Sequence, residues 1–202
     1  IDSDTADYNA FSLNYENGEM RFIVDTKTSG TVRFTLGLPG IHNVSNALAC
    51  VALLDELGLP MLEIQRGLAS FRGVRRRFDI QIKTPDLVYI DDYAHHPEEL
   101  KSLIDSLRMM YPEQQIDAIF QPHLYSRTRD FSNAFSEQLS RFDSLILLPI
   151  YPARETEIIG VSSDWLLSMI HLKHKAVLSP TRVLEVMKQK TKGVIVTIGA
   201  GD

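Results

Sequence analysis

The sequence predicts an α/β protein whose carboxy-terminal part is a doubly wound, mostly parallel β-sheet. From residue 86 onward, five short apolar runs alternate with four segments that have helical periodicity. Strands separated by helices are typical of parallel sheets, because each parallel connection has to cross back over the sheet. Before residue 72 the pattern differs, since short β-favouring runs with turn signals come first and two helical segments follow.

The first region is predicted to hold a β-hairpin and two helices. An Asn-Gly pair at 17–18 separates two β-favouring runs, and a Ser-Gly pair at 29–30 precedes a third run at 31–36. The alanine-rich segment 47–57 ends at a glycine and a proline, which is typical of a helix end. Segment 61–71 is predicted to be the second helix.

The second region is predicted element by element from apolar runs, caps and periodicity. In the first helix, Leu100, Leu103, Ile104 and Leu107 fall on one face. Pro180 suits the first turn of the last helix. The strand candidates are 86–91, 115–121, 144–150, 175–178 and 193–198, and the helix candidates are 97–110, 128–141, 162–171 and 180–190.

Composition and charge narrow the class of protein. The chain has 202 residues, of which 44% are hydrophobic and 23% charged, so it is long enough for one large or two small globular domains. A net charge of −5 argues against a dedicated nucleic-acid binder, and the apolar runs are too short to span a bilayer. The lone cysteine, Cys50, excludes an internal disulfide and fits a reducing compartment. Its apolar neighbours predict a small buried core residue.

Polar and titratable residues collect directly after two of the predicted strands. The segment Asp91 to Pro97 brings two carboxylates, a phenol and two imidazoles to a strand-to-helix turn, and Gln121 to Arg129 follows the next strand. Such groups are costly to bury without partners and often mark a site, and ligands of open α/β sheets bind at the carboxyl ends of strands. We expect these two strands to be neighbours in the sheet, and we therefore expect their two turns to form one binding site. The adjacent histidines do not predict zinc, because neighbouring side chains point in different directions.

Two weaker motifs precede them. His42, Asn43 and Asn46 lie at the start of the alanine-rich helix, where amides can bind a polar heterocycle, although an asparagine there is also a common N-cap. Three arginines at 75–77 lie at the apparent junction of the two regions, and we expect at least one to be solvated.

In this order, the four motifs resemble those of the Mur ligase family. The matching residues are His42-Asn43 with Asn46, Arg76-Arg77-Phe78-Asp79, Asp91 to Pro97 and Gln121 to Arg129, with further matches at Tyr151 to Glu155 and Gly199 to Gly201. The resemblance covers essentially the whole chain and is strongest to the members that add L-alanine. It implies that residues 1–77 are the end of the family's central ATPase domain. Residues 78–202 are then its Rossmann-like amino-acid-binding domain, truncated at its carboxy terminus.

The resemblance implies an ATP-dependent ligase of peptidoglycan precursor synthesis in the cytoplasm. Such a ligase joins L-alanine to UDP-N-acetylmuramate through an acyl phosphate, with ATP and Mg²⁺. It implies ATP-binding roles for five residues: His42, Asn43, Asn46, Arg77 and Asp92. It places Tyr93, His95, His123 and Arg127 around L-alanine, with Arg127 on the carboxylate and His95 assisting proton removal from the ammonium. Some members have an arginine at the position of Leu124, so a second carboxylate contact is expected to be missing or supplied elsewhere.

No phosphate-binding loop of the G-x-x-x-x-G-K-[ST] type occurs in the 202 residues. We therefore expect the phosphate loop, the magnesium ligands and the UDP-sugar domain upstream, no metal site in this chain and no ligation by the chain alone. The nearest alternative is a sister ligase that attaches a preformed peptide to UDP-N-acetylmuramate. Another is a non-catalytic nucleotide-binding or interaction module, although the dinucleotide fingerprint G-x-G-x-x-G follows no predicted first strand.

Overall fold

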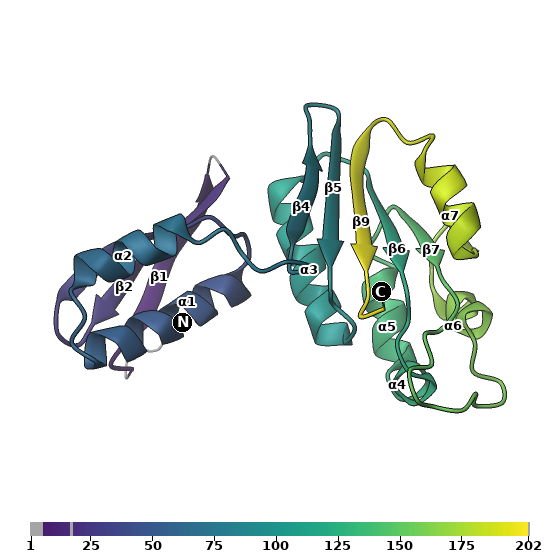
Figure 1. The fold of residues 1–202 in the computed structure, drawn as a ribbon, viewed down its shortest axis with the longest axis horizontal. Helices are drawn as coiled ribbons and strands as arrows, with labels where there is room; N and C mark the ends of the chain where they lie inside the picture. Colours follow the sequence, from purple (N-terminus) through teal and green to yellow (C-terminus); the bar gives the residue numbers. More distant parts are fainter. Residues whose placement is uncertain (1–5, 17, 202) are drawn as a thin grey trace. The chain divides into compact units, whose positions relative to one another are not determined.

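The computed structural model describes residues 6–16 and 18–201, which form two compact units. The first unit runs to Gly73, and the second comprises residues 74–107 and 111 onward (Figure 1). The domain boundary predicted between residues 77 and 78 stays a prediction, and the compact units divide slightly earlier. In the described ranges, no helix combines the length and apolar character needed to cross a membrane.

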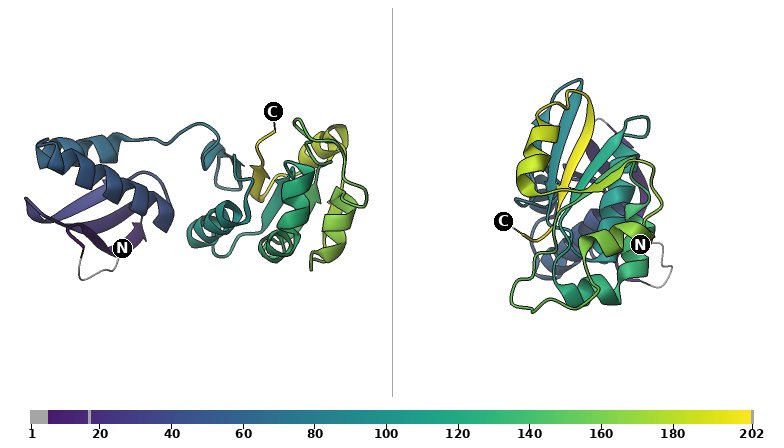
Figure 2. Two further views of the ribbon diagram at one scale, coloured as in Figure 1. Left: turned by 90° about the horizontal axis from the view of Figure 1, so that it is seen from below. Right: turned by 90° about the vertical axis from the view of Figure 1, so that its right-hand side faces the viewer.

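The first unit is a three-stranded antiparallel sheet with two helices on it. The sheet has the order β1-β2-β3, and the views in Figure 2 place both helices on the same face of it. The predicted hairpin and helices are confirmed, although the asparagine of the 17–18 turn lies outside the described residues. The elements are β1 (Asn9–Glu16), β2 (Glu19–Thr26), β3 (Gly30–Leu36), α1 (Ile41–Glu56) and α2 (Met61–Ser70).

The core of the first unit follows from the alternation along β2. Met20, Phe22 and Val24 point inward and are buried, because successive side chains of a strand face opposite sides. Phe22 stacks on Phe34 of β3, with ring centroids 5.8 Å apart, and Val51 of α1 closes the same cluster.

The prediction that Cys50 is a buried core residue is wrong, because Cys50 is exposed. The buried face of α1 carries Val44, Ala47 and Val51. An alanine-rich helix has small residues on every side, so apolar neighbours in the sequence do not identify the face that packs on the sheet.

The second unit contains the predicted doubly wound sheet. Within the described residues the sheet has six strands in the order β4-β5-β9-β6-β7-β8. All pairs are parallel except β4 with β5. The strands are β4 (Asp79–Lys83), β5 (Leu87–Asp92), β6 (Ile116–Phe120), β7 (Ser144–Leu147), β8 (Lys175–Val177) and β9 (Gly193–Ile198). The five predicted strands are confirmed.

The sixth strand, β4, was not predicted. It lies at the edge of the sheet, and most of its side chains are exposed, including those of Ile80 and Ile82. An edge strand buries few side chains and carries charges that discourage further pairing, so its sequence lacks a buried apolar run.

The helices cover both faces of this sheet, with α3 and α5 on one face and α7 on the other (Figure 2). They are α3 (Pro97–Met110), α4 (Tyr125–Asp130), α5 (Ser132–Leu139), α6 (Ser163–Met169) and α7 (Pro180–Met187). The single helix predicted over 128–141 is wrong, because two helices meet at Phe131 and the first already begins at Tyr125.

The last strand lies between the two strands that carry the polar turns. β9 pairs with β5 on one side and with β6 on the other. The expectation that β5 and β6 are neighbours is therefore wrong, although their carboxyl ends do lie at the same edge of the sheet. The chain returns through α7 to the central position, which places Gly199 to Gly201 between the two turns.

Candidate functional site

The turn after β5 is built around a buried carboxylate. Asp92 is 8% exposed and accepts hydrogen bonds from the backbone N–H of Phe78 at 2.7 Å and of Ala94 at 2.8 Å. Burial raises the pKa of Asp92, while the two N–H groups and the Arg77 charge act in the opposite direction. Both carboxylate oxygens hold the turn, and the predicted contact with a ribose stays a prediction.

Four of the predicted site residues form one continuous cluster. The rings of Tyr93 and His95 meet edge to face with centroids 5.4 Å apart, and His95 meets His123 at 6.1 Å. Arg127 follows, with its Nη1 atom 3.4 Å from Nδ1 of His123. Residues from the ends of β5 and β6 thus converge at one edge of the sheet, despite the strand between them.

Burial and two nearby charges favour the neutral form of His123. Burial lowers the pKa of His123, and the charges of Arg127 and His95 lower it further, against a smaller effect of Glu155. A guanidinium can only donate hydrogen bonds, so Nδ1 of His123 accepts from Arg127. The neutral imidazole therefore orients the guanidinium without repelling it.

The loop between β7 and α6 fixes the helix that carries Arg127. The carboxylate of Glu155 accepts hydrogen bonds from the backbone N–H of Ser126, at 2.9 Å, and from its hydroxyl. Tyr151 stacks on His123 with centroids 5.5 Å apart, and its carbonyl accepts the N–H of Leu124 at 2.9 Å.

The arginines at 75–77 have different surroundings. Arg76 has its Nε 3.3 Å from a carboxylate oxygen of Asp91, and its Nη2 donates to the carbonyl oxygens of Gly199 at 2.8 Å and Gly201 at 2.6 Å. Arg77 is more than half exposed and lies 3.8 Å from Glu99. Arg75 is exposed, as expected of at least one of the three.

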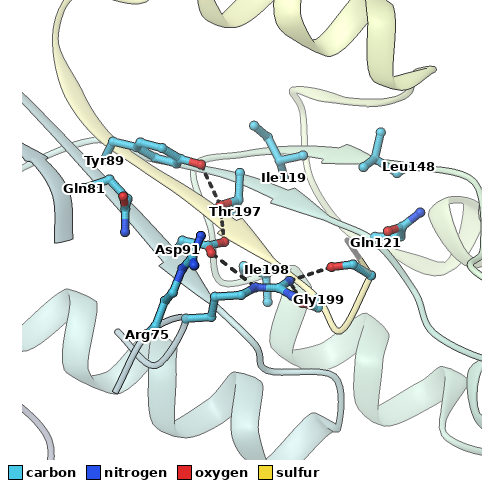
Figure 3. A pocket seen from close by; sticks show the side chains of 12 residues that line it. Arg75, Gln81, Tyr89, Asp91, Ile119, Gln121, Leu148, Thr197, Ile198 and Gly199 are labelled. Atoms are coloured by element: carbon cyan, nitrogen blue, oxygen red, sulfur yellow. Dashed lines mark hydrogen bonds and ion pairs between the residues drawn. The ribbon is translucent and has the colours of Figure 1, made fainter. Parts of the chain in front are cut away.

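A pocket of about 770 Å³ opens beside this cluster (Figure 3). In Figure 3 the Tyr89 hydroxyl meets Thr197 at 3.1 Å, and Thr197 donates to Asp91 at 2.7 Å. Tyr89, Thr197 and Asp91 thus form a chain of hydrogen bonds along the pocket. The four clustered site residues do not line the pocket, which is bounded by Arg75, Gln81, Ile119, Gln121, Leu148 and Ile198 among others.

A family model described as "Mur ligase, glutamate ligase domain" matches residues 76–201. The chain belongs to the Mur ligase family. That span contains the whole cluster and the loop that supports it, so the polar edge of the sheet is part of a Mur ligase domain.

Individual relatives agree with this assignment. The chain is 46% identical over 200 residues to the UDP-N-acetylmuramate–L-alanine ligase of Flavobacterium psychrophilum, covering 99% of this chain and 45% of that protein. The enzyme of the same name from Flavobacterium johnsoniae is 43% identical, with 99% and 44% covered. The chain therefore spans less than half the length of these relatives.

Two solved structures share the fold of this chain. The UDP-N-acetylmuramate-alanine ligase of Thermotoga maritima superposes with a TM-score of 0.80 at 28% identity, covering 99% of this chain and 44% of that one. A murein peptide ligase from Psychrobacter arcticus gives a TM-score of 0.64 at 19% identity, covering 98% and 42%. The second likeness shows the fold alone.

The first unit of this Mur ligase chain carries the remaining predicted site residues. His42, Asn43 and Asn46 lie in the first turns of α1, whose N-cap is Gly40. Asn43 Nδ2 donates to the carbonyl oxygen of Pro39 at 2.6 Å, so neither asparagine caps the helix. Their role toward ATP stays a prediction.

The two adjacent histidines diverge. His95 faces His123, whereas His96 caps α3 and its ring packs against Phe131 with centroids 4.7 Å apart. No group of three or more histidine, cysteine, aspartate or glutamate side chains that could hold a metal ion occurs in residues 6–16 and 18–201.

No role was assigned from the sequence to four residues that hold the site in place. Arg76, Glu99, Tyr151 and Glu155 all contact the turns or the predicted site residues. Glu99 lies three residues after the N-cap His96, as in a capping box, although the usual sequence signal has a serine or threonine at the N-cap. The contacts of the other three depend on tertiary structure.

Proposed function

We propose that this chain is part of an ATP-dependent ligase that joins L-alanine to UDP-N-acetylmuramate in the cytoplasmic synthesis of peptidoglycan precursors. The observation that carries the proposal is the juxtaposition of Tyr93, His95, His123 and Arg127 at one edge of the sheet. The relatives named UDP-N-acetylmuramate–L-alanine ligase support the choice of L-alanine as the acceptor.

In this proposal, Arg127 binds the carboxylate of L-alanine. A guanidinium pairs with a carboxylate through two parallel hydrogen bonds, which fixes the orientation of the amino acid. The α-amine then points away from Arg127, along the row of rings formed by His123, His95 and Tyr93. Holding the amine in an attack orientation is a large part of what such an enzyme has to supply.

The reaction requires the neutral amine of alanine and an activated sugar carboxylate. ATP, as a substrate, phosphorylates the carboxylate of UDP-N-acetylmuramate, and the amine displaces phosphate from the resulting acyl phosphate. For ATP we propose adenine contacts from His42, Asn43 and Asn46, a ribose contact from Asp92 and a phosphate contact from Arg77. Among the described residues, no group of three or more histidine, cysteine, aspartate or glutamate side chains could hold a metal ion.

A chimera tests the proposal. The 202 residues replace the matching segment of the Flavobacterium psychrophilum ligase, and product is measured with ATP, UDP-N-acetylmuramate and either L-alanine or a tripeptide. We expect product with L-alanine only, and none from the 202-residue chain alone. Product with the tripeptide alone would establish the sister peptide ligase, and a folded chimera with neither activity would favour a non-catalytic module.

A further inference from the structure

The Nδ1 atom of His95 faces two hydrogen-bond acceptors. It lies 2.9 Å from the carbonyl oxygen of Tyr93 and 3.3 Å from Oε2 of Glu99. A carbonyl and a carboxylate can only accept, so Nδ1 has to carry the proton. In the neutral ring the lone pair then lies on Nε2, for which the described residues offer no hydrogen-bond partner.

Glu99 is itself held in place. Its Oε2 atom accepts the backbone N–H of His95 at 2.8 Å and of His96 at 3.1 Å, which completes a capping box at the start of α3. Its Oε1 atom lies 3.8 Å from Arg77. The carboxylate therefore has a fixed position on a helix, and its charge lies against the side of the imidazole opposite to Nε2.

We propose that Glu99 is a positioning residue that fixes His95 with its proton on Nδ1, so that Nε2 acts as the base toward the amine of L-alanine. The inference deepens the proposed function and rests on it. Nε2 accepts one proton from the α-ammonium group, and the freed lone pair forms the C–N bond with the acyl carbon. The C–O bond to phosphate breaks with its electron pair, and the second amine proton leaves with the phosphate.

The charges around His95 are consistent with a base at Nε2 and a carboxylate-binding role for Arg127. Glu99 is the anion that contacts the ring, and it stabilises the imidazolium that forms when Nε2 takes a proton. Arg77 reaches the other oxygen of Glu99, while Arg127 lies beyond His123. The positive charge of Arg127 is thus placed for the alanine carboxylate, with the neutral His123 between it and His95.

The first arm of the test measures the tautomer directly. Long-range ¹H–¹⁵N spectra of the histidine-labelled 202-residue chain are recorded at a pH of about 8, above the usual histidine range. His95→Asn identifies the signals of His95. We expect the Nδ1–H form, and an Nε2–H form would overturn the proposal. Since this arm needs no ligation, a chimera that makes no product refutes the proposed function without deciding the tautomer.

The second arm separates catalysis from capping. Glu99→Gln keeps an oxygen for the two backbone N–H groups but removes the charge, and Glu98→Gln is the matched control one residue away. In the ligating chimera we expect Glu99→Gln to lower kcat by about 10–100-fold, with the KM for L-alanine unchanged. An unchanged kcat, or a change confined to KM, would overturn the proposal, as would an equal loss in the control.

Discussion

Replacing Asp92 should destabilise the second unit more than replacing an exposed acidic residue of the same unit does. In Asp92→Ala the backbone N–H groups of Phe78 and Ala94 lose their acceptor in a site that is 8% exposed. Each unpaired buried donor costs about 1–3 kcal/mol. Removing a buried carboxylate offsets part of this cost, so we expect a net loss of about 2–4 kcal/mol. Asp92→Asn keeps one acceptor oxygen and should lose about 1–2 kcal/mol.

The single tryptophan makes this measurable. Trp165 lies in α6 of the second unit, so urea unfolding followed by its emission reports that unit. Asp105→Asn, in an exposed ion pair, is the control and should change the unfolding free energy by less than about 1 kcal/mol. Unchanged midpoints for both Asp92 variants would refute the reasoning.

The pH dependence of the same experiment has a definite sign. Burial raises the pKa of Asp92 above its ordinary value of 3.8. Protonation of Asp92 therefore stabilises the folded state. This stabilisation is complete at a pH below the pKa of Asp92 in the unfolded chain, and it is lost as the pH rises through the pKa of Asp92 in the folded chain. The stability difference between the native chain and Asp92→Asn should widen on acidification from pH 7, and a narrowing would contradict this account.

Three further predictions use the same fluorescence assay. Lys190→Met should cost about 1–3 kcal/mol at pH 7, because the carboxylate of Asp117 is 3% exposed and loses its cation at 2.6 Å. Burial raises the pKa of Asp117, but the hydrogen bonds that its carboxylate accepts from Lys190, Ser144 and Gln115 lower this pKa overall. The loss should therefore be full above the unfolded pKa and should shrink as the pH falls through the folded pKa. Gly199→Ala should cost about 1–3 kcal/mol, because φ is +144° and the new Cβ would lie 3.0 Å from a backbone oxygen. Arg76→Met should cost about 1–3 kcal/mol by freeing two carbonyl oxygens after β9, whereas the exposed Arg75→Met should be neutral. Equal effects of these two arginine variants would contradict the role of Arg76.

The sequence predicted the fold where the burial of side chains is periodic. β5, β6 and β9 are apolar runs inside a parallel sheet, and α3 has a proline, a cap and an apolar face. The edge strand β4 was missed because Ile80 and Ile82 are exposed. The break at Phe131 was missed because α4 and α5 together look like one amphipathic segment. The order of the strands was not predicted, since nothing local places β9 between β5 and β6.

The sequence predicted which side chains form the candidate site. It did not predict the contacts that hold these side chains in place. The turns after β5 and β6 were identified by their clustered titratable residues, and the structure brings Tyr93, His95, His123 and Arg127 together. Arg76 acts through carbonyl groups more than 120 positions away in the chain. The motif that contains Arg76 is visible in the sequence, but the carbonyl groups that Arg76 contacts are set by the tertiary structure.

The most direct test of the central claim is the KM for L-alanine of the ligating chimera with and without Arg127. If Arg127 binds the alanine carboxylate, Arg127→Ala should raise this KM about tenfold or more, since a charged hydrogen-bond pair contributes about 1.5–3 kcal/mol. Arg182→Ala, whose side chain is 70% exposed on α7, should leave it unchanged. A folded Arg127→Ala chimera with an unaltered KM would contradict the assignment of this edge of the sheet as the amino-acid site.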